Sequence, residues 1–197
     1  MEQTRSTRLT AAGVGLVLGM LLLALGLALW RGVGQAEQGR SDVGGSRAPS
    51  FTAPLFEAAP GTAPGTAAAD AGTAFVLDEH ADQPIFIYFW ASWCLPCREE
   101  AQTIQEIWPE YRDRGYMFVG LNIWDLQRDA EAFIDEFGLA FPLARDAERS
   151  VYVEYGVQGL PAAFFLEPGL SIRSRYDGAL DEATLRGLLD EIGGTTS

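Results

Sequence analysis

The chain contains no lysine, only two cysteines and a single histidine, His80. A zinc site is disfavoured, because the cysteine pair would need two further ligands and the chain offers no third cysteine and only His80 as an imidazole. All 14 basic side chains are arginines, and they stand against 27 acidic ones for a net charge of −13. This balance argues against nonspecific binding of nucleic acids, because polyanions would be repelled. Phosphate-binding and dinucleotide-binding glycine motifs are also missing, as is a Ser-His-Asp set.

The two cysteines, Cys94 and Cys97, are separated by Leu95 and Pro96 and follow an apolar, strand-like run over residues 85–90. A C-x-x-C pair lets the sulfurs meet with little backbone movement, so a disulfide can close and reopen. If a helix begins here, Cys94 lies at its N-terminus, where free N–H groups and the helix dipole lower the pKa of a thiol. Cys94 is therefore the predicted nucleophile and Cys97 the shielded resolving thiol.

A passive structural disulfide is the alternative interpretation of this pair. A bridge between two residues only three positions apart closes a very small loop, and it therefore constrains the unfolded chain little. The spacing and the setting of Cys94 and Cys97 favour a redox-active dithiol instead.

Two segments carry a resemblance to a known family. Residues 88–100 read YFWASWCLPCREE, and residues 155–166 read YGVQGLPAAFFL. Both are similar to the corresponding segments of thioredoxin-like thiol-disulfide oxidoreductases of the membrane-tethered TlpA or ResA type. The resemblance covers residues 73–193 and implies a thioredoxin-like α/β fold, in which helices flank a central mixed β-sheet.

The same resemblance assigns a role to Leu160 and Pro161. It implies that both residues lie beside the Cys94 sulfur and that the peptide bond between them is cis, which is uncommon enough to need a purpose. The backbone of Leu160 would then be available to pair with an extended substrate. An ordinary trans proline in a turn is the alternative.

Three residues around the cysteines, Trp93, Leu95 and Pro96, are further candidates for substrate binding. Trp93 is expected to cover the site and to shape substrate access, because aromatic side chains are favoured at recognition surfaces. Trp124 and Asp125 follow a predicted strand at the edge where sites form in α/β proteins. For those two residues the pattern favours a packing role.

The candidate proton acceptor is Glu100. Cytoplasmic thioredoxins carry a buried aspartate six residues before the first cysteine, where this chain has Tyr88. Glu100 aligns with an acid that ResA-type proteins carry near the dithiol, and a buried carboxyl with a raised pKa can serve Cys97 as a general base. The alternative is that Glu100 only places favourable negative charge in the first turns of a helix.

Residues 9–30 contain no charged side chain. As a helix these 22 residues would span about 33 Å, which is enough to cross a bilayer core. Because Arg5 and Arg8 precede the run, we expect a signal anchor with residues 1–8 in the cytoplasm. A cleaved signal peptide is the alternative. Either arrangement places the dithiol outside the cytoplasm, and the anchor predicts a single-pass protein of the cell membrane.

Beyond the anchor, residues 31–72 are rich in Gly, Ala, Pro, Ser and Thr and predict a flexible linker, in which residues 51–56 are apolar enough to dock on the domain. Residues 73–197 predict one α/β domain. Its expected strands cover residues 74–77, 84–90, 116–123, 162–167 and 171–176. Its expected helices cover residues 96–114, 127–137, 150–155 and 181–192, with Pro109 kinking or splitting the first.

These features predict an extracytoplasmic thiol-disulfide oxidoreductase that reduces protein disulfides and needs no metal or bound cofactor. Leu95 and Pro96 favour reduction, since strongly oxidising dithiols carry a histidine between the cysteines. The resemblance implies a membrane thiol as electron donor and the cysteine pair of apocytochrome c as a substrate. The alternatives are an oxidase or isomerase for secreted proteins and a noncatalytic binding module. A peroxide-reducing enzyme is disfavoured, because Ala91 stands where its active-site threonine would be.

Overall fold

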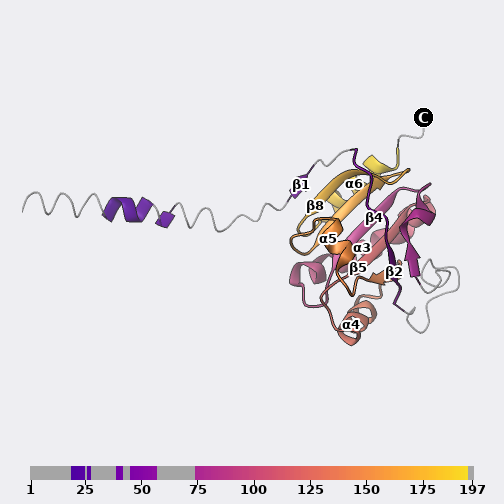
Figure 1. Cartoon of the computed structure of the whole chain (residues 1–197), viewed down its shortest axis with the longest axis horizontal. Helices are drawn as coiled ribbons and strands as arrows, with labels where there is room; N and C mark the ends of the chain where they lie inside the picture. Colours follow the sequence, from indigo (N-terminus) through magenta and orange to yellow (C-terminus); the bar gives the residue numbers. More distant parts are fainter. Residues whose placement is uncertain (1–18, 25, 28–38, 42–44, 57–73, 195–197) are drawn as a thin grey trace, which may run out of the picture. The chain divides into compact units, whose positions relative to one another are not determined.

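The structure is a computed structural model that describes residues 19–24, 26–27, 39–41, 45–56 and 74–194 (Figure 1). The chain divides into two compact units, Met1–Glu37 and Gln38–Ser197. In the first unit the described residues are helical. Among the residues described, none of the helices has the length and apolar character needed to span a membrane. Most of the predicted anchor, residues 9–30, lies outside the described residues.

The second unit is built on a six-stranded mixed sheet with the strand order β1-β8-β7-β4-β5-β6 (Figure 1). Its strands are β1 (Gly39–Ser41), β4 (Ile85–Trp90), β5 (Met117–Asn122), β6 (Leu143–Arg145), β7 (Ala162–Glu167) and β8 (Ser171–Asp177). Strands β4, β5 and β6 run parallel to one another, whereas β7 and β8 are antiparallel to their neighbours. The three parallel strands therefore end at one edge of the sheet, where sites form in open α/β folds.

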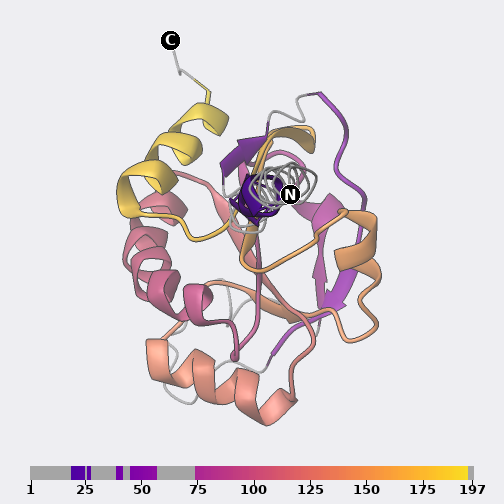
Figure 2. The same ribbon diagram turned by 90° about the vertical axis from the view of Figure 1, so that its left-hand side faces the viewer.

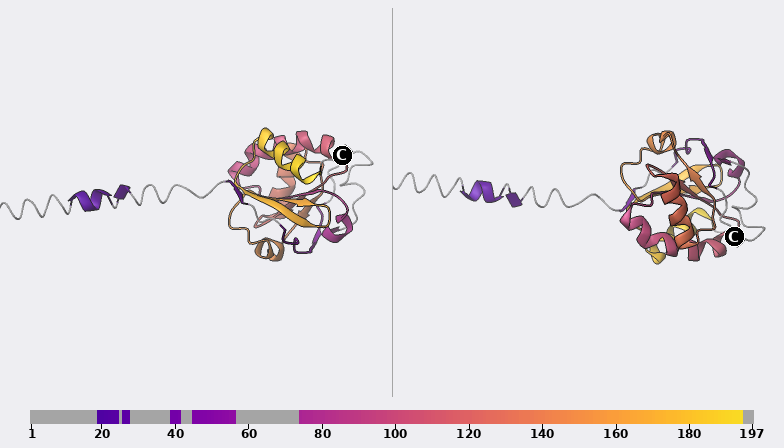
Figure 3. Two further views of the ribbon diagram at one scale, coloured as in Figure 1. Left: turned by 90° about the horizontal axis from the view of Figure 1, so that it is seen from above. Right: turned by 90° about the horizontal axis from the view of Figure 1, so that it is seen from below.

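Helices cover both faces of this sheet (Figure 3). The helices are α3 (Leu95–Asp113), α4 (Gln127–Phe137), α5 (Ser150–Glu154) and α6 (Glu182–Ile192), with a 3-10 helix η1 (Leu77–His80). Helices α3 and α6 lie on one face and α5 on the other, and α3 lies between α6 and α4 (Figure 2). This arrangement confirms the predicted thioredoxin-like order of elements.

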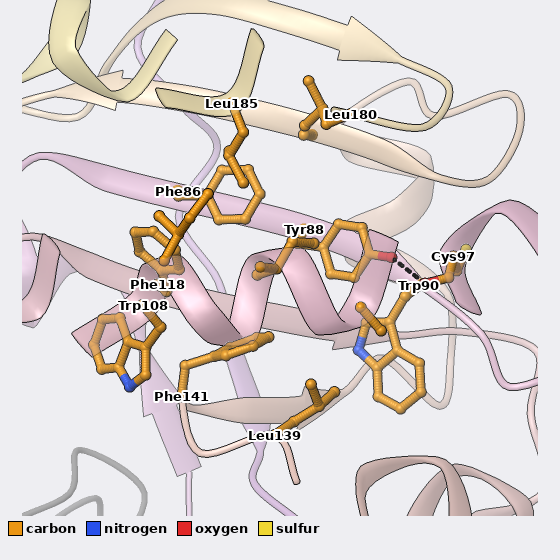
Figure 4. Close-up of a cluster of buried hydrophobic side chains, with 14 of the residues drawn as sticks. Phe86, Tyr88, Trp90, Cys97, Trp108, Phe118, Leu139, Phe141, Leu180 and Leu185 are labelled. Carbon is orange, nitrogen blue, oxygen red and sulfur yellow. Dashed lines mark hydrogen bonds between the residues drawn. The ribbon is translucent and has the colours of Figure 1, made fainter. Parts of the chain in front are cut away.

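All six side chains of β4 are buried, because successive residues of a strand point to opposite faces and both faces are covered. The two resulting clusters of buried side chains use alternate residues of the strand. One cluster contains Phe86, Tyr88 and Trp90, and the other contains Ile85, Ile87 and Phe89. Figure 4 shows part of the first cluster, which packs against α3.

Part of the segment predicted as a linker, residues 31–72, belongs to the folded unit. Strand β1 pairs with β8, and β2 (Thr52–Pro54) pairs with β3 (Ala74–Val76) in a second, two-stranded sheet. Residues 45–56, which we call the strap, place Phe51 and Ala53 in the core cluster opposite α3. The domain therefore begins earlier than residue 73, because apolar side chains of this Pro-rich and Ala-rich stretch pack against one face of the sheet.

The predicted strands and helices of the domain are all present, each with ends within one residue of the predicted ones. The strands β1, β2 and β6 were missed: each has only three residues, and β1 and β2 lie in the stretch whose composition predicted a linker. Helix α3 continues through Pro109, so of the two predicted effects the split is wrong. Trp108 and Tyr111 are buried on either side of Pro109, and their packing outweighs the one lost backbone hydrogen bond.

We expect Phe51→Ala to lower the free energy of unfolding by about 3 kcal/mol, because it removes a buried ring from the strap. That ring packs against Phe75 and Tyr155. Denaturant unfolding of the oxidised full-length chain measures the effect. Thr52→Ala, at the exposed neighbouring position, is the matched control and should change stability by less than about 0.5 kcal/mol. Equal effects of the two substitutions would show that the strap contributes no core packing.

Candidate active site

The start of α3 carries the dithiol. Cys94 is the N-cap residue with an extended backbone, and its Sγ accepts the N–H of Cys97 at 3.2 Å. The two cysteines are joined by a disulfide with an S–S distance of 2.02 Å. Cys97 is completely buried, whereas Cys94 keeps 4% of its surface exposed. Cys94 is therefore the sulfur that another protein can approach.

The local sequence explains this geometry. Leu95 and Pro96 occupy the first turn of α3, where the N–H that proline lacks would have no partner within the helix. The turn before the helix closes through the Cys94 N–H, which donates to the carbonyl of Ala91 at 3.2 Å. Because the Cys97 N–H already points at the Cys94 sulfur, a thiolate formed there would meet a donor and the positive end of the helix.

The peptide bond between Leu160 and Pro161 is cis, as the resemblance implied. In the register of the sheet, Ala162 pairs with Phe89 near the end of β4. Pro161 therefore lies at the same end of the sheet as the loop that carries Cys94. Pro161 is buried, and Leu160 is half-buried against both core clusters.

Glu100 lies one turn along α3 from Cys97 and is 2% exposed. Its Oε2 accepts the backbone N–H of Leu180, while Oε1 is buried without a hydrogen bond of normal geometry. Burial raises the pKa of Glu100 from its usual 4.5 to about 7, and the Leu180 N–H and the Tyr88 hydroxyl oppose that rise. A carboxyl with this pKa exchanges protons readily near neutral pH, which suits a general base.

Tyr88 joins this group although the sequence did not predict it as a site residue. Its hydroxyl lies 3.5 Å from the carbonyl oxygen of Cys97 (Figure 4). Burial raises the pKa of Tyr88, and the nearby Glu100 carboxyl raises it further, so the phenol stays protonated. The available signal was its position: Tyr88 lies on the same face of β4 as Phe86 and Trp90, which is the face that α3 covers.

An apolar rim flanks the dithiol. Within the described part of the domain, five large hydrophobic side chains are exposed, with four of them between 48 and 66%. Of these four, Trp93 and Leu95 are the chain neighbours of Cys94, and Trp124 and Leu126 belong to the loop after β5 that contacts Trp93. The indole N–H of Trp93 donates to the carbonyl of Trp124 at 2.8 Å. This contact leaves the ring itself free to meet a partner.

Trp124 and Asp125, for which the sequence favoured packing, reach across to the active-site loop. The Trp124 ring packs against Tyr152 with 4.7 Å between the ring centres, and the Trp124 carbonyl accepts the Trp93 hydrogen bond. The Asp125 carboxylate accepts hydrogen bonds from Ser92. The packing role of Trp124 is thus present, but the contacts to Ser92 and Trp93 were missed.

Comparisons with known proteins agree with this geometry. The model of the AhpC/TSA family matches residues 45–175. The thiol-disulfide oxidoreductase ResA of Geobacillus thermodenitrificans is 28% identical over 143 residues, which cover 72% of this chain and 82% of the relative. ResA of Bacillus thuringiensis subsp. konkukian is 24% identical over 177 residues, which cover 90% and 93% of the two chains.

The fold is also found among solved structures. A Chlorobium tepidum protein named thiol:disulfide interchange protein DsbE superposes with a TM-score of 0.66 at 23% identity. The superposition covers 78% of this chain and 100% of that chain. At this identity the likeness shows the shared thioredoxin-like fold.

The raised pKa of Glu100 predicts a specific dependence of stability on pH. The folded state favours the protonated carboxyl, so this contribution to stability is full below pH 4.5 and is lost as pH rises to about 7. The shift corresponds to about 3 kcal/mol. We expect Glu100→Gln to remove this loss of stability at rising pH. Unfolding of the oxidised chain at several pH values between 4.5 and 8 measures the free energy of unfolding that shows it.

The neighbouring exposed residue provides the control for this experiment. Glu99→Gln removes an equal charge from the same turn of α3 but from an exposed side chain. Its stability should follow that of the wild type across the whole pH range. If Glu100→Gln also ran parallel to the wild type, Glu100 would not be a buried carboxyl with a raised pKa.

Proposed function

Because this chain belongs to the AhpC/TSA family and is a thiol-disulfide oxidoreductase of the ResA and DsbE type, we propose that it reduces disulfides of proteins outside the cytoplasm. The strongest support is the Cys94–Cys97 disulfide at the start of α3, with the Cys94 sulfur facing the Cys97 N–H. This arrangement suits a pair that alternates between dithiol and disulfide.

The reaction starts from the reduced enzyme. The Cys94 thiolate attacks one sulfur of a substrate disulfide, which forms a mixed disulfide and releases the other substrate sulfur as a thiolate. Glu100 then accepts the proton of Cys97, and the Cys97 thiolate attacks the Cys94 sulfur. The Cys94–Cys97 disulfide forms, and the second substrate thiolate leaves. The substrate gains two electrons and, with protons from Glu100 and solvent, becomes a dithiol.

Substrate binding draws on the residues around Cys94. The backbone of Leu160, next to the cis Pro161, offers hydrogen-bonding groups to an extended segment of the substrate. Trp93 and Leu95 present exposed apolar surface, and Pro96 supports the first turn of α3. The substrate is therefore a polypeptide that can extend its cysteine-bearing segment over this rim.

Reduction is the favoured direction because neither Leu95 nor Pro96 supplies a positive charge that would stabilise the Cys94 thiolate. The oxidised enzyme then needs two electrons, and a membrane thiol carrier is the proposed donor. Residues 9–30 are proposed to anchor the protein in the cell membrane, with residues 1–8 in the cytoplasm. The cysteine pair of apocytochrome c is the proposed substrate.

The midpoint potential of the Cys94/Cys97 pair tests this proposal. The full-length chain in mild detergent is equilibrated in glutathione or dithiothreitol buffers and followed by tryptophan fluorescence, since Trp93 adjoins Cys94. We expect a value near or below about −220 mV, as for a reductase that must be supplied with electrons. A value near about −120 mV would make the protein an oxidase instead.

The two single-cysteine variants are the controls. Neither Cys94→Ser nor Cys97→Ser can close the internal disulfide, so neither should show the reversible change of fluorescence. If the wild type also lacked a reversible couple, the protein would be a noncatalytic binding module.

A further inference from the structure

Asp125 connects two loops at the edge of the sheet where the parallel strands end. Its Oδ2 accepts the backbone N–H of Ser92 at 2.6 Å and the side-chain amide of Asn122 at 3.0 Å. Its Oδ1 accepts the hydroxyl of Ser92 at 2.8 Å. Asn122 is the last residue of β5 and is buried. One carboxylate thus joins the end of β5 to the loop between β4 and α3.

Ser92 belongs to the turn that leads to the nucleophile. That turn runs from Ala91 to Cys94 and is closed by the Cys94 N–H, which donates to the Ala91 carbonyl at 3.2 Å. Ser92 and Trp93 are its two central residues. Both are held by the loop after β5, Ser92 through Asp125 and Trp93 through its indole N–H.

The contacted loop is itself well supported. Trp124 has a left-handed backbone with φ of 52°, which is uncommon for a bulky residue. Its ring packs on Tyr152 of α5, and Asn122 holds Asp125 from the buried end of β5. The acceptors of the hydrogen bonds from Ser92 and Trp93 are therefore held in place by the rest of the domain.

We propose that Asp125 is a positioning residue, which through Ser92 sets the orientation of Cys94 at the start of α3. This inference rests on the proposed function, since orientation matters when Cys94 must act as a thiolate. In the observed orientation the Cys94 sulfur faces the Cys97 N–H at 3.2 Å. The Cys97 N–H and the helix N-terminus stabilise the thiolate. If the turn of residues 91–94 were loosened, the Cys94 sulfur would move away from both.

Two substitutions of Asp125 separate its geometry from its charge. Asp125→Asn can keep all three hydrogen bonds, because its oxygen can replace Oδ2 and its amide can donate to the Ser92 hydroxyl, which also accepts. Asp125→Ala leaves the three donors without their acceptor. Both substitutions remove the negative charge, and both leave the buried Glu100 and Tyr88 unchanged.

The primary readout is the pH at which Cys94 of the reduced full-length chain becomes half-reactive toward iodoacetamide. A positioning role predicts that Asp125→Ala raises this midpoint by about 0.5 unit or more, since the thiolate loses its donors. Asp125→Asn should leave it near the wild-type value. A direct effect of charge predicts the opposite sign, a lower midpoint in both variants, because a nearby carboxylate disfavours a thiolate.

Turnover gives a second readout. With insulin as the disulfide substrate, we expect kcat/KM of Asp125→Ala to fall about tenfold, as for a misplaced reacting group. Asp125→Asn should retain most of the wild-type value. Ser92→Ala removes only the hydroxyl donor and should give a smaller change in the same direction. Ser92→Ala also tests the inference if Asp125→Ala does not fold.

Asp190 provides the matched control. It belongs to α6, and its Oδ1 accepts the Tyr111 hydroxyl at 3.0 Å and an Arg114 N–H at 2.8 Å. Asp190→Ala therefore removes a hydrogen-bonded carboxylate that joins α6 to the C-terminal end of α3, at the opposite end of that helix from Cys94. It should lower stability without moving the Cys94 midpoint.

Three results would overturn the positioning role: an unchanged midpoint in Asp125→Ala, a downward shift in both Asp125 variants, or an equal upward shift in Asp190→Ala. These results differ from a failure of the proposed function. Alkylation by iodoacetamide needs no physiological substrate, and the wild-type midpoint potential is measured separately. A wild type whose Cys94/Cys97 pair shows no reversible redox couple would overturn the proposed function. A reversible couple in the wild type, together with an unchanged Cys94 midpoint in the Asp125 variants, would overturn only the role of Asp125.

Discussion

The burial of strand β4 on both faces is the constraint on which the site depends. Its six side chains fill two cores, one under α3 and one under α5 and the strap. A strand fixed in this way cannot slip, because a shift of one residue would exchange the two sets of side chains. The loop at its end, which carries Cys94, therefore starts from a fixed position. The same alternation places Tyr88 under α3, where it meets Cys97 and Glu100.

Charged side chains at the surface of this domain behave differently from the buried Glu100. Ion pairs such as Arg98 with Glu136 and Arg186 with Glu110 lie at the surface, where each contributes little to stability. Glu100 is instead buried beneath the dithiol, so burial changes its proton affinity in a way that surface charges do not experience. In a chain with a net charge of −13, the Glu100 carboxyl is thus able to exchange protons near neutral pH.

The dithiol is served by loops from three different strands. Strand β4 leads to the cysteines, the loop after β5 contributes Asp125, and the segment before β7 contributes Pro161. Because β4 and β5 are parallel while β7 is antiparallel, the C-terminal ends of the first two meet the N-terminal end of the third at one edge. The exposed rings of Trp93 and Trp124 gather at this edge, so the apolar surface offered to a partner lies next to the reactive sulfur.

The sequence by itself determined what depends on near neighbours in the chain. The spacing of Cys94 and Cys97 predicted the dithiol, and local periodicity placed the long strands and helices to within one residue. The cis bond before Pro161 and the candidacy of Glu100 came from a family resemblance carried by short motifs. The membrane anchor over residues 9–30 stays a prediction from composition.

Only the tertiary structure decided which distant polar and apolar groups meet. Ser92 and Asp125 are 33 residues apart, and the pairing of β4 with β5 brings them into hydrogen-bonding distance. Phe51 docks on a sheet whose strands, apart from β1, all follow it in the chain. The composition of its own segment therefore indicated a linker. Contacts of this kind are set by sheet register and layer packing, which no local pattern records.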